Sequence, residues 1–65
     1  MTKREILLNE LDTLISYTFM MMERYIEGKL TEEQMKQTLK FIDDKHDELA
    51  SELAILELLE NVSLN

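Results

Sequence analysis

The sequence predicts an all-α protein in which two antiparallel helices form a hairpin, and three observations carry this prediction. Proline is absent and glycine occurs once in 65 residues, while the helix-favouring residues leucine, glutamate, methionine and lysine are abundant. Apolar residues recur at alternating spacings of four and three over two long stretches. The single glycine lies between these stretches. We therefore expect one domain, 1–65, with helices over about 3–27 and 32–61 joined by a turn at 28–31.

The first helix is predicted to begin after Thr2, which caps it, with Glu5 three residues later completing a capping box. Its core positions follow a heptad pattern, namely Leu7, Leu11, Leu14, Thr18, Met21 and Tyr25. The apolar face extends beyond this seam through Leu8, Ile15, Phe19, Met22 and Ile26. A face this wide exceeds what one neighbouring helix covers, so we expect the hairpin to dimerise into a four-helix bundle.

The turn and the start of the second helix carry the most specific local signals. Gly28 is expected to adopt the left-handed conformation that ends the first helix. Thr31 and Gln34 form a second capping box, and Leu30 and Met35 occupy the positions of a hydrophobic staple. Because the connection is short, the two helices are expected to be antiparallel neighbours.

The second helix carries an unbroken heptad seam, which consists of Met35, Leu39, Ile42, His46, Leu49, Leu53 and Leu56. Folding the chain about residue 29 or 30 pairs positions whose numbers add up to about 60, so Thr18 should meet Ile42 and Leu14 should meet His46. The second helix then extends past the first. We expect the last residues, 63–65, to be frayed.

The overhanging part of the second helix has an apolar pattern on a different face, formed by Ile55, Leu58, Leu59 and Val62. Phe19, Met20 and Phe41 also lie off the main seams. We predict a dimer or partner interface built from Leu8, Ile15, Phe19, Met20, Met22, Ile26, Phe41, Ile55, Leu58, Leu59 and Val62. The acidic residues around the overhang are interpreted as a solvated face, with a docking patch for a basic partner as the alternative.

Composition narrows the function classes. Seven basic residues stand against fourteen acidic ones, and the net charge of −7 disfavours non-specific binding to nucleic acid or to anionic membranes. The absence of cysteine excludes disulfides and cysteine-ligated zinc. No signal peptide and no membrane-spanning stretch are recognised, so a cytoplasmic location is expected.

No residues with an arrangement suited to catalysis stand out. His46 and Asp43 lie one turn apart, but the first helix offers no inward carboxylate near Leu14 to complete a metal site. We expect His46 to sit at a core position, hydrogen-bonded to Asp43 or to a backbone carbonyl. The serines have no nearby base or glycine-rich elbow. We therefore predict no catalytic, cofactor-binding or metal-binding residues, no cofactor, no small-molecule substrate and no enzymatic activity.

Three segments carry a resemblance to a known family: residues 1–5 (Met-Thr-Lys-Arg-Glu), residues 33–34 (Glu-Gln) and residues 46–49 (His-Asp-Glu-Leu). They resemble the Rop family of plasmid-copy-number RNA-binding proteins, which implies an antiparallel homodimer of hairpins. The family's RNA-binding face lies on its first helix, and Lys3 fits that pattern. The residues that depart from it are Glu10, Leu14, Thr18 and Tyr25, which stand where Asn, Phe, Gln and Lys are expected. We carry over the fold and not the activity.

A shorter segment, residues 10–15 (Glu-Leu-Asp-Thr-Leu-Ile), is similar to the signature of the small sporulation aspartyl-phosphate phosphatases. That resemblance implies a hairpin that docks on a response regulator, with Asp12 as its functional residue. In that family the signature lies on the second helix, whereas here it lies on the first.

The function expected from these observations is that of a small acidic regulator or inhibitor, from a bacterium or its phage or plasmid. It would act without catalysis, through a homodimer and through contact with another protein. The alternatives are a Rop-like RNA-binding regulator and a response-regulator phosphatase of the sporulation type.

Overall fold

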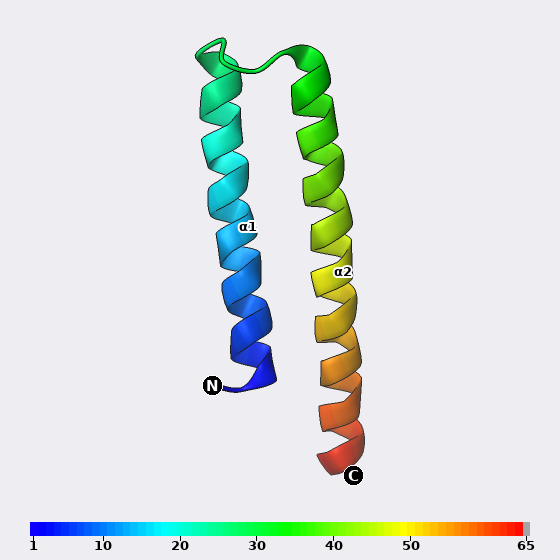
Figure 1. The fold of residues 1–65 in the computed structure, drawn as a ribbon. Helices are drawn as coiled ribbons and strands as arrows, with labels where there is room; N and C mark the ends of the chain where they lie inside the picture. The colour runs from blue at the N-terminus through cyan, green and yellow to red at the C-terminus, as the bar shows by residue number, and fades with distance from the viewer. Residues whose placement is uncertain (65) are drawn as a thin grey trace.

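The computed structural model describes the backbone of residues 1–64 and the side chains of residues 1–62. Over this range the chain forms α1 (Lys3–Ile26) and α2 (Glu32–Leu64), which pack side by side in opposite directions (Figure 1). The described residues include no strand. The molecule is a flat rod with extents of 53 × 20 × 11 Å. These features confirm the all-α helical hairpin.

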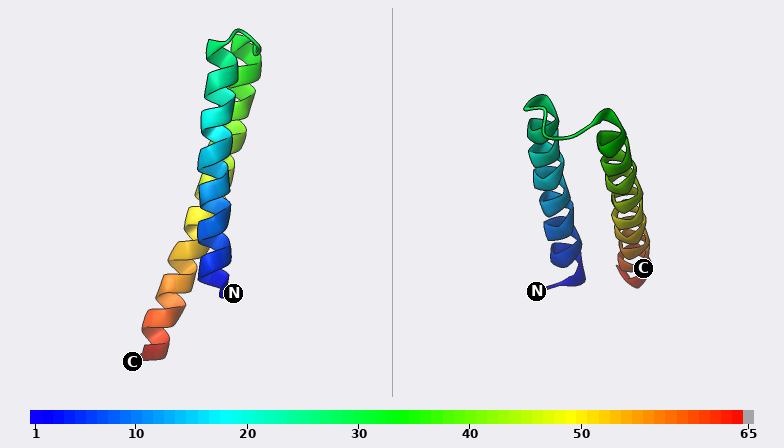
Figure 2. Two further views of the ribbon diagram at one scale, coloured as in Figure 1. Left: turned by 90° about the vertical axis from the view of Figure 1, so that its left-hand side faces the viewer. Right: turned by 45° about the horizontal axis from the view of Figure 1, so that its top comes forward.

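The second helix is longer than predicted. It continues to Leu64 instead of ending near residue 61, while Asn65 lies outside the described residues. No glycine or proline interrupts this stretch, so nothing in the sequence ends the helix earlier. Two further views show that the helices cross at a shallow angle and that the final turns of α2 diverge from α1 (Figure 2).

The first helix begins and ends with the predicted caps. At its start, the Oγ1 atom of Thr2 accepts a hydrogen bond from the backbone N–H of Glu5 at 3.2 Å. At its end, Gly28 has a φ of +77°, and its N–H donates to the carbonyl of Tyr25. The N–H of Lys29 donates to the carbonyl of Arg24, which completes a Schellman motif.

The second helix begins with a complete capping box. The backbone N–H of Thr31 donates to Oε1 of Gln34 at 2.9 Å, and the N–H of Gln34 donates to Oγ1 of Thr31 at 3.1 Å. Leu30 and Met35, at the staple positions, are both half-buried. The turn is therefore closed on both sides by hydrogen bonds that the sequence predicts.

The core is a single layer between the helices. Among the described side chains, the buried apolar residues are Leu7, Met21, Ile42 and Leu49. Around them lie half-buried seam residues, which include Leu11, Leu14, Thr18, Leu53 and Leu56. The Thr18 hydroxyl donates to the carbonyl of Leu14 at 2.8 Å, which satisfies this polar seam residue within its own helix.

One part of the predicted seam of α2 is wrong. The side chain of His46 is 62% exposed instead of occupying the core, and its Nδ1 atom lies 3.8 Å from Oδ1 of Asp47 instead of bonding to Asp43. Leu39 is also exposed, at 44%. An α-helix has 3.6 residues per turn, so a heptad seam spreads over an arc that one neighbouring helix covers only in part. His46 and Leu39 fall on the uncovered edge of that arc.

Candidate protein-interaction surfaces

Most large apolar side chains of this hairpin face outward. All eleven residues predicted for an interface are exposed, from Met20 at 41% to Ile26 at 80%. The structure adds four large apolar residues to this exposed set, namely Met1, Ile6, Tyr25 and Leu39. The exposed apolar residues therefore far outnumber the buried ones among the side chains described.

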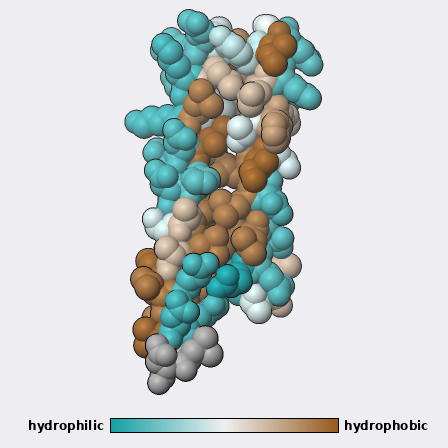
Figure 3. All heavy atoms as spheres, turned by 180° about the vertical axis from the view of Figure 1, so that it is seen from behind, coloured by the Kyte–Doolittle hydropathy of each residue, from teal (hydrophilic) through white to brown (hydrophobic). Residues whose placement is uncertain are grey.

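Five of these residues form a stripe along α1, which we call the α1 stripe and which consists of Leu8, Ile15, Phe19, Met22 and Ile26. Their spacings of seven, four, three and four place them on one side of the helix. A space-filling view of one face of the molecule shows apolar residues running in a band along its length, with polar residues on both sides (Figure 3).

The α1 stripe continues across to α2 near the turn. Met22 and Ile26 line a groove of about 330 Å³ together with Met35 and Leu39 of α2. The charged residues in this groove are Glu32 and Lys36, whose charges offset each other. This face is thus apolar and close to electrically neutral where the two helices meet.

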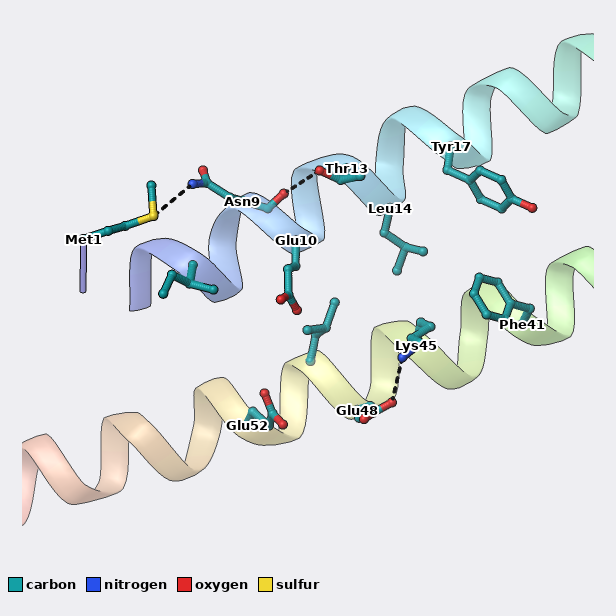
Figure 4. A pocket seen from close by; sticks show the side chains of 12 residues that line it. Met1, Asn9, Glu10, Thr13, Leu14, Tyr17, Phe41, Lys45, Glu48 and Glu52 are labelled. Carbon is teal, nitrogen blue, oxygen red and sulfur yellow. Dashed lines mark hydrogen bonds and ion pairs between the residues drawn. The ribbon is translucent and has the colours of Figure 1, made fainter. Parts of the chain in front are cut away.

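A second and larger groove, which we call the acidic groove, lies between α1 and α2 in the half of the hairpin away from the turn. It has a volume of about 620 Å³, and its lining residues include Ile6, Glu10, Leu14, Tyr17, Phe41, Glu48, Leu49 and Glu52. The rings of Tyr17 and Phe41 meet edge to face, with centroids 6.2 Å apart and planes at 74° (Figure 4). Helical geometry puts Tyr17 about 160° round α1 from Ile15, so the acidic groove and the α1 stripe lie on opposite faces.

The charges of the acidic groove are unbalanced. Glu10 points from α1 toward α2, and Glu48 and Glu52 contribute carboxylates from α2 (Figure 4). Lys45 also lines the groove, with its Nζ atom 3.6 Å from Oε2 of Glu48. Three carboxylates and one lysine ammonium group therefore line the groove beside an apolar floor.

An ion-pair cluster ties the start of α1 to the far part of α2. Arg4 bonds to the carboxylate of Glu60, and its Nη1 atom lies 3.6 Å from Oε1 of Glu57. The hydrogen bond that Arg4 donates to Glu60 and the charges of both carboxylates raise the pKa of the Arg4 guanidinium above its ordinary value. This cluster holds α2 beside the N-terminus of α1, so the overhang begins later than the sequence suggested.

The predicted interface residues fall into separate groups. Ile55 and Leu59 line a small hollow of about 140 Å³ that shares Glu52 with the acidic groove and also contains Lys3 and Leu56. Phe41 lines the acidic groove, and Met22 and Ile26 line the groove beside Leu39. The exposed residues outside these three grooves include Met20, Leu58 and Val62. The structure thus divides the predicted interface between two faces and the end of α2.

The residues carried by the two resemblances are dispersed as well. Glu10 and Leu14 line the acidic groove, whereas Tyr25 lies beside Met22 on the other face. Asp12 is exposed on α1.

Among the residues that the structure describes, no three His, Asp or Glu side chains form a group that could hold a metal ion. In the same part of the chain, no helix combines the length and the apolar character needed to cross a membrane.

The acidic groove was missed by sequence reasoning, although a signal for it was present. Tyr17 and Phe41 are opposite each other when the chain is folded about the turn, and each lies to one side of the heptad seam of its helix.

Comparison of the chain with protein-family models, with curated proteins and with solved structures finds no match in any of the three.

Proposed function

We propose that this chain is a non-enzymatic regulatory protein of the cytoplasm, which acts by binding other proteins through its helical surfaces and which self-associates into a four-helix bundle. The observation that supports the proposal is the amount of surface that the hairpin leaves exposed. Its solvent-accessible surface is 5304 Å². A compact monomer of 7.7 kDa is expected to expose only about 4,300 Å².

A second copy accounts for this excess. Two separate hairpins expose about 10,600 Å² in total, whereas a compact protein of twice the mass exposes about 7,200 Å². The difference of about 3,400 Å² falls within the range of roughly 2,000–5,000 Å² that obligate homodimers bury. A dimer also supplies the core that chains of fewer than about 70–80 residues usually lack.

The test is a dilution series in which sedimentation velocity gives the mass and circular dichroism gives the helicity at each concentration. We expect a helical dimer that loses helicity as it dissociates, because the second copy covers apolar surface that the monomer exposes. A chain that remains a fully helical monomer at every concentration would contradict self-association. Oligomers much larger than a dimer would indicate a structural assembly protein instead.

The regulatory part of the proposal needs a separate test. Exposed apolar residues at the end of α2 support contact with a foreign protein. The double variant Ile55→Asp with Leu59→Asp should weaken partner binding, because it places charge in an apolar contact. If this variant left both self-association and partner binding unchanged, the end of α2 would not be an interaction surface. Tight, salt-sensitive binding to structured RNA that is lost when Lys3 and Arg4 are both changed to alanine would favour a nucleic-acid function instead.

A further inference from the structure

We infer that the acidic groove binds a basic amphipathic helix of another protein. This inference rests on the proposed function, because it specifies the chemistry of the foreign partner and the face that receives it.

The floor of the acidic groove is apolar and elongated. Leu49 is buried and Leu14 is half-buried at its base, and the Tyr17–Phe41 pair lies toward the turn. From Ile6 to Tyr17 the helix rises about 17 Å, which equals about three turns of a docked helix. A partner would therefore present apolar residues at i, i+3 or i+4, and i+7 to this floor.

The backbone of the hairpin favours a helix over a strand as the occupant. An added strand needs a row of unpaired N–H and C=O groups along a sheet edge. The groove is walled by α1 and α2, whose backbone groups bond within each helix, so their walls offer no such row. A third helix instead packs its side chains between those of the two helices, as in other bundles.

Charge decides which kind of helix fits. Glu10, Glu48 and Glu52 border the groove, and its ammonium group, Lys45, already lies beside Glu48. A second copy placed here would bring together two surfaces that are both negatively charged, which is unfavourable. A helix with lysine or arginine flanking its apolar stripe brings opposite charges together.

The opposite face remains available for self-association. The α1 stripe contains no charged residue, and the groove beside it balances Glu32 with Lys36. The acidic groove and the α1 stripe lie on opposite sides of the hairpin, so a dimer formed through the stripe leaves the groove open. Each copy in the dimer would then bind one basic helix.

The experiment uses fluorescent peptides of about 14 residues, long enough for the three-turn groove. The first has a leucine stripe flanked by lysines, the second has the same stripe flanked by glutamates, and the third has the composition of the first in scrambled order. We expect the full chain to bind the first peptide and not the second or third. Backbone amide NMR shifts should map the contact to Tyr17 and Phe41 and not to Ile15 and Leu39.

Two matched variants test the charge contribution. The variant Glu10→Gln/Glu48→Gln/Glu52→Gln should weaken binding of the basic peptide about tenfold, as expected for three exposed charge pairs. The control Glu23→Gln/Asp43→Asn/Asp44→Asn removes the same net charge from residues that do not line the groove and should bind like the unaltered chain. Circular dichroism should show equal helicity for both variants.

Three outcomes would overturn the inference: equal binding of the acidic peptide, equal loss of binding in the control variant, or binding of no peptide. If no peptide bound but the dilution series showed a dimer, the inference about the acidic groove would be wrong and the proposed self-association would still hold. If a monomer bound the basic peptide, the inference about the acidic groove would hold and the proposed four-helix bundle would be wrong.

Discussion

At the scale of single residues, the turn depends on one backbone conformation. Gly28 has a φ of +77°, which residues with a Cβ atom adopt only at a cost. A Cβ atom built on Gly28 would meet no other atom within 4 Å, so the space around it is open. The requirement for glycine is therefore conformational and not steric, and the two effects can be separated by substitution.

We expect Gly28→Ala to lower the free energy of unfolding by about 1–2 kcal/mol, because alanine is disfavoured in the left-handed region. Gly28→Asn should cost less, since asparagine tolerates this region better. Urea denaturation at one fixed protein concentration measures both. Equal losses for the two variants would point to a cause other than backbone conformation.

At the scale of the helices, the capped ends could be predicted from the sequence, but the far end of α2 and the rotation of α2 about its axis could not. Caps are local, so Thr31 and Gln34 indicate a helix start regardless of the rest of the chain. The face that a helix buries depends on its neighbour. A seam of seven residues on α2 predicted a buried His46, whereas the single neighbouring helix covers only part of that seam. The acidic groove was missed because its aromatic residues, Tyr17 and Phe41, lie outside both seams, on the side of the hairpin opposite Leu39.

The distinction between covered and uncovered seam positions can be measured with two alanine substitutions. Leu49→Ala should lower the free energy of unfolding by about 2–4 kcal/mol, because Leu49 is only 7% exposed. His46→Ala should change it by less than about 0.5 kcal/mol, because the side chain is mostly in water. A comparable loss for His46→Ala would mean that a second chain buries this residue in solution.

At the scale of the whole molecule, net charge and apolar surface act in opposite directions. A charge of −7 on each chain opposes self-association, while the exposed apolar residues favour it. The same negative charge would attract the proposed basic partner to the acidic groove. Salt shortens the range of both electrostatic effects, from roughly 10 Å at 0.1 M to roughly 3 Å at 1 M.

Salt should therefore change the two associations in opposite directions. Raising the sodium chloride concentration from 0.1 to 1 M should tighten self-association about three- to tenfold, because repulsion between the copies is screened. It should weaken binding of the basic peptide, because attraction is screened. Sedimentation and fluorescence anisotropy on the same samples measure the two effects. Weaker self-association at high salt would mean that ion pairs, and not apolar contacts, hold the copies together.

The closed turn also determines the order in which the hairpin forms. Contacts beside Gly28 join residues that are close in the chain, whereas the Arg4–Glu60 bond joins residues separated by 56 positions. Closing a longer loop costs more entropy, so zipping is expected to start at the turn and to reach Arg4 last. Opening would run in reverse, from the free ends inward. The acidic groove lies in the half that closes late, so a bound helix would slow the first step of unfolding and lengthen the lifetime of the folded hairpin.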